Sequence, residues 1–241
     1  MKIIDKINAK SKNIMDNPGV TIACLGASTV QGCFEIYRDE KGNIDTVFEQ
    51  ENAYHSYMRK IFSILYPKVP INIINAGISG DTAEHGAKRL ERDVLRHDPD
   101  LVILSFGKND IWGGDEGLLK YISATKEIIR AVKERGIEIV YLTCSMLNTD
   151  VSPHITDEGI RELAEKTAKI QQDGTMDKYQ NAVMELCRQE GVPVCDLYGD
   201  WKLMQKNGVN ITELLANKIN HPIRELNWLA AMSLVKTIME N

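Results

Sequence analysis

The sequence predicts an α/β fold in which a parallel sheet is covered by helices on both faces. Short apolar runs alternate five times with segments of helical periodicity along the 241 residues, which is the pattern of a parallel sheet with crossover helices. The run 101–106 is apolar throughout, as expected of a strand that is buried on both faces. No linker or low-complexity tract interrupts the alternation, so we expect residues 1–241 to form one domain.

Each strand is expected at an apolar run rich in residues that favour extended backbone. In chain order these runs are 20–25, 71–75, 101–106, 137–142 and 192–196. The last run contains Pro193, which has no N–H to donate to a neighbouring strand. We therefore expect the fifth strand at an edge of the sheet.

Helices are expected between the strands, where apolar residues recur with a period near 3.6. These segments are 1–17, 53–65, 83–94, 118–132, 157–172, 176–190 and a last helix that begins at Pro222. Proline is favoured in the first turn of a helix, where its missing N–H has no intrahelical role. Residues 143–156 are expected to form a long loop.

Residues 34–51 show neither the helical nor the strand period. The sequence from Arg38 to Asn43, Arg-Asp-Glu-Lys-Gly-Asn, is typical of a turn at the tip of an excursion. Because the excursion follows the first strand closely, we expect it to form a flap near Ser28.

The composition excludes several classes of function. A net charge of −5 argues against a nucleic-acid-binding protein, which needs clustered Lys and Arg. No early apolar segment has the length or flanks of a signal peptide or a membrane span, so we expect a cytoplasmic protein without a membrane partner. The cysteines show no C-x-x-C pairing and are expected to be reduced and buried: Cys24, Cys33, Cys144, Cys187 and Cys195.

Polar and glycine residues follow the predicted strands. Ser28 follows the first strand and Gly80 the second, Asn109 follows the third, and His221 precedes the last helix. In open α/β sheets, ligands bind at the carboxyl ends of the strands. A hydroxyl, flexible backbone donors, a side-chain amide and a histidine are the groups that acyl transfer needs.

Each of these residues also has a simpler interpretation. Ser28 could cap a helix, Gly80 could permit a tight turn, Asn109 could cap a helix or hold a turn, and His221 could be a solvated residue before the last helix. Their coincidence at one predicted edge favours a joint role. The sequence has no P-loop, no G-x-S-x-G elbow and no metal-binding histidine spacing, so no metal site is expected.

Four ordered blocks resemble the SGNH, or GDSL-type, esterases and lipases. They are residues 26–32, 75–82, 107–110 and 220–222. The resemblance implies a three-layer α/β/α sandwich with a five-stranded, flavodoxin-like sheet and no cofactor. It also implies roles for four residues: Ser28 as nucleophile, His221 as general base, and an oxyanion hole made by the N–H groups of Ser28 and Gly80 and by the Asn109 amide.

Two positions depart from the family pattern, because Ala27 and Lys218 stand where the family usually has aspartates. The second position matters more, since the acid in a Ser-His-Asp site orients the imidazole and a lysine cannot accept its N–H. Another acceptor is expected. The candidates are a backbone carbonyl within 217–219, the Asn217 side chain, and Asp196.

These observations lead to the hypothesis of a serine ester hydrolase. The expected substrate is a small or carbohydrate-linked acyl ester, an acetyl ester among them, because no apolar surface suited to a membrane is apparent. The missing acids motivate an alternative, a catalytically weak or inactive esterase-like domain that binds an acylated ligand. A third possibility is a flavodoxin-like binder of nucleotides or phosphate.

Overall fold

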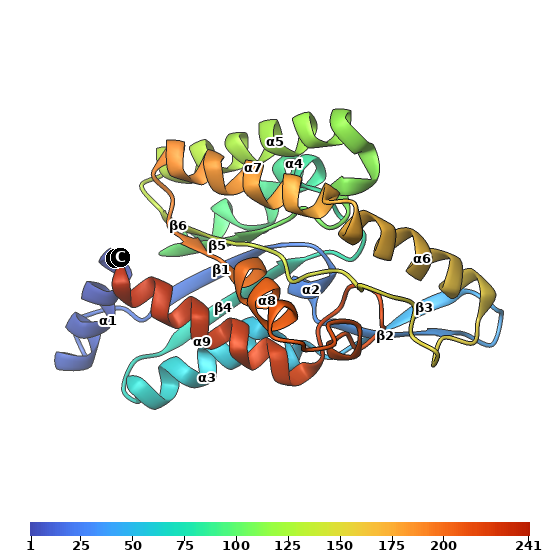
Figure 1. The fold of residues 1–241 in the computed structure, drawn as a ribbon. Coiled ribbons are helices and arrows are strands. Elements are labelled where there is room, and N and C mark those ends of the chain that lie inside the picture. The colour runs from blue at the N-terminus through green and yellow to red at the C-terminus, as the bar shows by residue number, and fades with distance from the viewer.

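A five-stranded parallel sheet organises residues 1–241, all of which the computed structural model describes (Figure 1). Its strands are β1 (Val20–Gly26), β4 (Ile71–Gly77), β5 (Leu101–Ser105), β6 (Glu138–Leu142) and β7 (Val194–Cys195). Their spatial order is β4-β1-β5-β6-β7, and every neighbouring pair is parallel. The predicted edge position of the last strand is confirmed.

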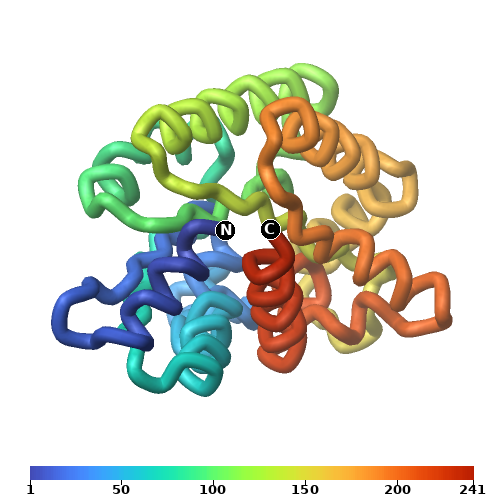
Figure 2. Tube along the Cα trace, turned by 90° about the vertical axis from the view of Figure 1, so that its left-hand side faces the viewer, coloured from blue at the N-terminus to red at the C-terminus, as the bar shows by residue number.

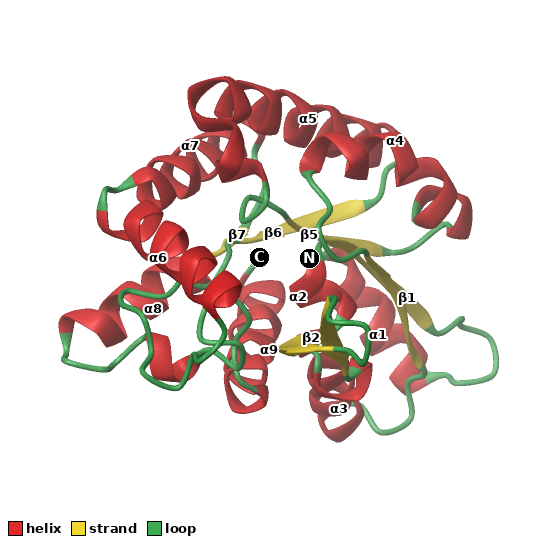
Figure 3. Ribbon diagram, turned by 90° about the vertical axis from the view of Figure 1, so that its right-hand side faces the viewer, coloured by secondary structure: helices red, strands yellow, loops and turns green.

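Helices cover both faces of the sheet, so the predicted three-layer α/β/α sandwich is confirmed (Figures 1 and 3). One face carries α4 (Ala83–Asp93), α5 (Gly114–Glu134) and α7 (Thr175–Glu190). The other face carries α1 (Lys2–Lys12), α3 (Tyr54–Leu65), α8 (Leu197–Lys206) and α9 (Arg224–Glu240). The α6 helix (Glu158–Gln172) extends past the sheet toward a hairpin formed by residues 33–48.

The central strands form the middle of one large core. Residues 22–25 of β1 and 101–104 of β5 are completely inaccessible to solvent, because helices lie above and below them. The core comprises 55 buried residues. Continuous apolar sequence in these two strands is therefore explained by burial on both faces.

The excursion after β1 is an antiparallel hairpin of β2 (Cys33–Arg38) and β3 (Ile44–Phe48). Its tip coincides with the predicted turn, where the Asp39 side chain accepts hydrogen bonds from the backbone N–H groups of Lys41 and Asn43. Arg38 pairs with Asp157 at the start of α6. The hairpin shows no clear period in the sequence because most of its residues beyond Phe34 remain partly exposed.

The ends of several predicted elements differ from the structure, and the first helix, predicted over 1–17, ends at Lys12. The last helix begins at Arg224 rather than at Pro222, because Pro222 forms an isolated antiparallel bridge with Leu215. The fifth strand contains two residues, Val194–Cys195, and Asp196 already accepts a hydrogen bond from the Gly199 N–H at the start of the unpredicted helix α8. Short helical segments complete the chain: α2 (Ser28–Gln31), η1 (Gln50–Asn52), η2 (Leu95–His97), η3 (Asp110–Gly113) and η4 (Thr212–Leu214).

The two termini lie side by side (Figure 2) and line one shallow groove. The backbone N–H groups of Lys2 and Ile3 donate to the carboxylate of Glu138, at the amino end of β6. The termini are thus at the end of the sheet opposite to the hairpin (Figure 1). None of the helices is both long enough and apolar enough to cross a membrane.

Candidate active site

The carboxyl ends of three neighbouring strands meet at one edge of the sheet. Gly26 at the end of β1 is in register with Gly77 of β4 and with Ser105 of β5. The segments that follow these strands therefore converge. Three of the sequence-predicted site residues, Ser28, Gly80 and Asn109, lie in these segments and line one pocket together with His221.

Ser28 is the first residue of α2 and is only 8% exposed. The N-cap position belongs to Ala27, so Ser28 does not cap the helix. Its Oγ instead lies 3.0 Å from Nε2 of His221. The hydroxyl is held against the imidazole at a distance suited to proton transfer.

His221 is buried at the end of a tightly hydrogen-bonded loop. The Asn217 side-chain oxygen accepts hydrogen bonds from the backbone N–H groups of Ile219, Asn220 and His221, at 2.9–3.0 Å. From the other side, the Lys108 ammonium donates to the Asn220 carbonyl. These contacts fix the backbone that carries the imidazole.

The acceptor for the second ring nitrogen is the backbone carbonyl of Phe34, which lies 2.8 Å from Nδ1 of His221. A carbonyl only accepts hydrogen bonds, so Nδ1 carries the proton and Nε2 is free to accept the Ser28 hydroxyl proton. The hairpin thereby selects the tautomer that a general base needs.

The sequence prediction of the acceptor for the second ring nitrogen of His221 is wrong for all three candidates. Asp196 caps α8, the Asn217 side-chain oxygen is occupied by three backbone N–H groups, and the ring nitrogens bond to Phe34 and Ser28 rather than to any carbonyl of 217–219. Lys218, which stands in place of the family acid, adopts a left-handed φ of 58° and pairs with Glu213. The true acceptor lies on a strand that is distant in sequence, where proximity along the chain gives no indication of it.

Burial lowers the pKa of His221 to about 4. The positive charge of the buried Lys108 contributes to this lowering, whereas the Phe34 carbonyl and the Glu35 carboxylate oppose it. The desolvated imidazole is consequently neutral at physiological pH, which is the protonation state required of a base.

The backbone N–H groups of Ser28 and Gly80, both at the pocket, have no intramolecular acceptor. Gly80 adopts a φ of +79°, a conformation that glycine reaches without strain. Gly77 lets the same loop approach α2, because a Cβ atom there would lie 2.2 Å from the Gln31 nitrogen. The free N–H groups are therefore available to a negatively charged oxygen.

The Asn109 side-chain amide also lines the pocket. One of its N–H bonds donates to the Asp81 carbonyl at 2.7 Å, and the other has no intramolecular acceptor. The buried carboxylate of Asp110 holds this segment by accepting from the N–H groups of Gly107 and Ala83, both at 3.0 Å. Burial raises the pKa of Asp110 to about 6.

A buried arginine links the segments that carry these donors. The guanidinium of Arg89 donates to the Gly26 carbonyl at 2.9 Å, to the Ala76 carbonyl at 2.7 Å and to the Asp81 carboxylate at 2.7 Å. It thereby holds the end of β1, the end of β4 and the loop after Gly80 in one arrangement. Arg89 supports the site without lining the pocket.

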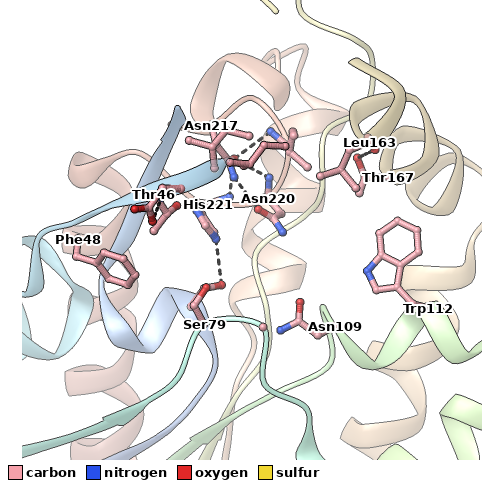
Figure 4. Close-up of a pocket in the computed structure, with 16 residues that line it drawn as sticks. Thr46, Phe48, Ser79, Asn109, Trp112, Leu163, Thr167, Asn217, Asn220 and His221 are labelled. Carbon is pink, nitrogen blue, oxygen red and sulfur yellow. Dashed lines mark hydrogen bonds between the residues drawn. The ribbon is translucent and has the colours of Figure 1, made fainter. Parts of the chain in front are cut away.

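The pocket above Ser28 has a volume of about 450 Å³. Thr46 and Phe48 of the hairpin lie on one side, Trp112 and Leu163 lie on the other, and His221 stands between them (Figure 4). The pocket walls combine aromatic rings with side-chain amides. The hairpin is thus both a wall of the pocket and the source of the Phe34 carbonyl, as expected of a flap near Ser28.

Comparison with known proteins identifies the family. Residues 24–225 match the GDSL-like Lipase/Acylhydrolase family. The chain belongs to this family. The match includes all four predicted site residues and the Phe34 segment.

Relatives with curated names match shorter parts of this GDSL-like chain. An acetylxylan esterase of Geobacillus stearothermophilus is 37% identical over 60 residues, which are 25% of this chain and 27% of the relative. An arylesterase of Vibrio mimicus is 34% identical over 74 residues, 30% of this chain and 36% of the relative. These matches span about a third of each relative or less.

Solved structures share the fold over nearly the whole GDSL-like chain. An acetylxylan esterase from Geobacillus stearothermophilus superposes with a TM-score of 0.66 at 20% identity, covering 92% of this chain and 94% of its own. A two-domain esterase active on acetylated mannans has a TM-score of 0.68 at 17% identity, covering 99% of this chain and 52% of its own. At these identities the similarity demonstrates the fold.

Several residues at the GDSL-like site were missed by sequence reasoning. Lys108 and Asp110 lie within the third block, and Trp112 is the second residue after it. A tryptophan beside a family block was a signal that could have been used. The Phe34 carbonyl leaves no such signal, because every residue type has a carbonyl.

Proposed function

We propose that residues 1–241 act as one domain that hydrolyses esters through an acyl-serine intermediate. The observation that carries the proposal is the hydrogen-bonded series from Ser28 through His221 to the Phe34 carbonyl. In the first step, Nε2 of His221 takes the hydroxyl proton while Ser28 Oγ attacks the ester carbonyl carbon. The imidazolium then gives this proton to the leaving alcohol.

The oxyanion that forms on the ester carbonyl is stabilised by three donors in this proposal. They are the N–H groups of Ser28 and Gly80 and the free N–H of the Asn109 amide. Donors fixed before the reaction stabilise developing charge without reorganisation. Water, deprotonated by His221, then attacks the acyl-serine and releases the acid and the free Ser28 hydroxyl.

The proposed substrate is an acetyl ester on a carbohydrate. The similarity to an acetylxylan esterase supports this substrate class, and so does the pocket. Trp112 and Phe48 present aromatic rings, while Asn220 presents a side-chain amide, a combination that suits a sugar ring with hydroxyl groups. The Phe34 carbonyl weakens the case for an inactive binding domain, since it gives His221 an acceptor in place of the missing acid.

The test compares substrates on the purified protein. We expect release of acetate from acetylated xylooligosaccharides, and faster hydrolysis of nitrophenyl acetate than of nitrophenyl butyrate. A fluorophosphonate probe should label Ser28, identified by peptide mass spectrometry. Absence of both hydrolysis and labelling would support the binding domain instead.

The pH dependence should report the depressed pKa of His221. The base must be neutral, so kcat/KM should stay high above pH 5 and fall tenfold per pH unit below about pH 4. In the unfolded chain this imidazole binds a proton below its ordinary pKa of 6.5. Because the unfolded chain then binds the proton and the folded chain does not, protonation of His221 reduces the free energy of unfolding as pH falls from about 6.5 to about 4.

The pH profile should be measured together with the imidazole resonances of His221 by NMR. A break in kcat/KM near pH 6 without titration of His221 would come from protonation of Asp110. Titration of His221 itself near pH 6.5 would contradict the prediction.

A further inference from the structure

We propose that Arg224 is a positioning residue that holds the Phe34 carbonyl against His221. In this role an ion-pair clamp between the hairpin and the start of α9 replaces the orienting effect of the missing acid at position 218. The inference rests on the proposed function for its kinetic consequences. The hydrogen bond that it explains can be measured independently of activity.

The clamp consists of one guanidinium and two carboxylates. Arg224 donates to both Glu35 oxygens, at 2.6 and 2.9 Å. It also donates to both Glu49 oxygens, at 2.7 and 2.5 Å. Paired N–H donors on each carboxylate give the planar geometry that makes such contacts directional. The interaction lowers the pKa of Glu49 to about 2 and lowers the pKa of Glu35.

The position of the clamp connects it to the base. Glu35 directly follows Phe34 in β2, Glu49 directly follows β3, and Arg224 lies three residues after His221. The guanidinium also lies over the Phe34 ring, 4.4 Å from its centroid. One side chain thus fixes both strands of the hairpin to the segment that carries the imidazole.

A backbone acceptor that lies on a separate element must be held near the histidine by other contacts. An aspartate three residues before the histidine belongs to the same loop, so local folding holds the two together. Phe34 is 187 residues away from His221 in sequence, and the hairpin pairs with no strand of the main sheet. Small displacements of the acceptor would misalign Nε2 with Ser28, and a displacement of about 1 Å in an active site can cost about 100-fold in rate.

The clamp is partly exposed, since the Arg224 side chain is 30% accessible to solvent. Exposed ion pairs contribute little to global stability. Its expected effect is therefore local, on the orientation of the hairpin. The net negative charge of one guanidinium with two carboxylates also favours the imidazolium that forms during the reaction, and Glu35 already raises the pKa of His221.

The test is Arg224→Met, with Arg38→Gln as the matched control. Arg38 also anchors the hairpin through an ion pair, to Asp157, but at the tip and away from Phe34. We expect Arg224→Met to lower kcat on nitrophenyl acetate about 10- to 100-fold with little change in KM, and to shift the acid limb of the kcat profile. Arg38→Gln should stay within about twofold of the wild type.

Proton and ¹⁵N NMR of His221 gives the readout that does not depend on activity. The Nδ1 proton should give a downfield, hydrogen-bonded signal in the wild type, in Arg38→Gln and in Ser28→Ala, and this signal should be lost or exchange-broadened in Arg224→Met.

If Arg224→Met does not fold, Glu49→Gln replaces it, with an expected loss of kcat of about 3- to 10-fold and a weakened Nδ1 signal. An unchanged Nδ1 signal in the folded variant would overturn the inference. Absence of esterase activity in the wild type would instead refute the proposed function and leave this NMR test intact.

Discussion

Ser28→Ala is expected to lower kcat for ester hydrolysis by at least about 10⁴-fold and to abolish labelling by a fluorophosphonate. The hydroxyl lies 3.0 Å from the His221 base, and no other side chain of the pocket offers a nucleophile to that nitrogen. Residual activity should reflect water attack assisted by the oxyanion donors. Initial rates on nitrophenyl acetate and mass spectrometry of the labelled protein provide the measurement.

Ser123→Ala is the matched control for this substitution, since Ser123 is an exposed serine of α5 remote from the pocket. Its kcat and labelling should equal those of the wild type. The loss of a single hydroxyl at Ser28 should leave the thermal unfolding midpoint nearly unchanged. Retention of labelling in Ser28→Ala would exclude Ser28 as the nucleophile.

Asn109→Ala is expected to lower kcat about 10²- to 10³-fold with a small effect on KM. This is the typical cost of removing one oxyanion donor, because the interaction strengthens only as charge develops on the substrate oxygen. The variant also loses the 2.7 Å hydrogen bond to the Asp81 carbonyl, at a cost of about 1 kcal/mol in unfolding free energy. Steady-state kinetics and thermal denaturation separate the two effects.

Asn109→Asp sharpens the test because it keeps the shape of the side chain and removes its donors. It should be at least as damaging to kcat as Asn109→Ala, since a carboxylate would repel the oxyanion. Asn207→Ala, at an exposed helix end, serves as the neutral control. An Asn109→Asp enzyme with wild-type kcat would remove Asn109 from the oxyanion hole.

The hairpin links substrate binding to the chemistry of the site. Residues of β2 and β3 line the pocket, while Phe34 at the base of the same hairpin accepts from His221. A change that displaces the Phe34 end of the hairpin is therefore expected to alter both specificity and the orientation of the base. A carboxylate within the histidine loop would keep these two properties separate.

Much of the fold was predictable from the sequence because it depends on local patterns. The unbroken apolar run of β5 indicates burial on both faces, and Pro193 indicates an edge strand. Both predictions are confirmed by the strand order and by the burial of β5. Helix α8 was missed, although Asp196 at its start is a common capping residue.

Sequence alone was sufficient to predict four of the residues that gather at the candidate site. Ser28, Gly80 and Asn109 follow strands whose carboxyl ends must share one edge in a parallel sheet, so their proximity is a consequence of strand order. At these positions, the residue type and its place after a predicted strand were enough to predict the site. His221 could be placed at the same edge because it precedes the last helix.

The orientation of His221, in contrast, is a property of the tertiary structure. The acceptor is the carbonyl of Phe34, a group that every residue possesses and that no sequence pattern marks. Its place depends on the path of a hairpin and on the ion pairs of Arg224 with Glu35 and Glu49. These contacts join segments that are remote along the chain, and their geometry arises only when the folded backbone brings them together.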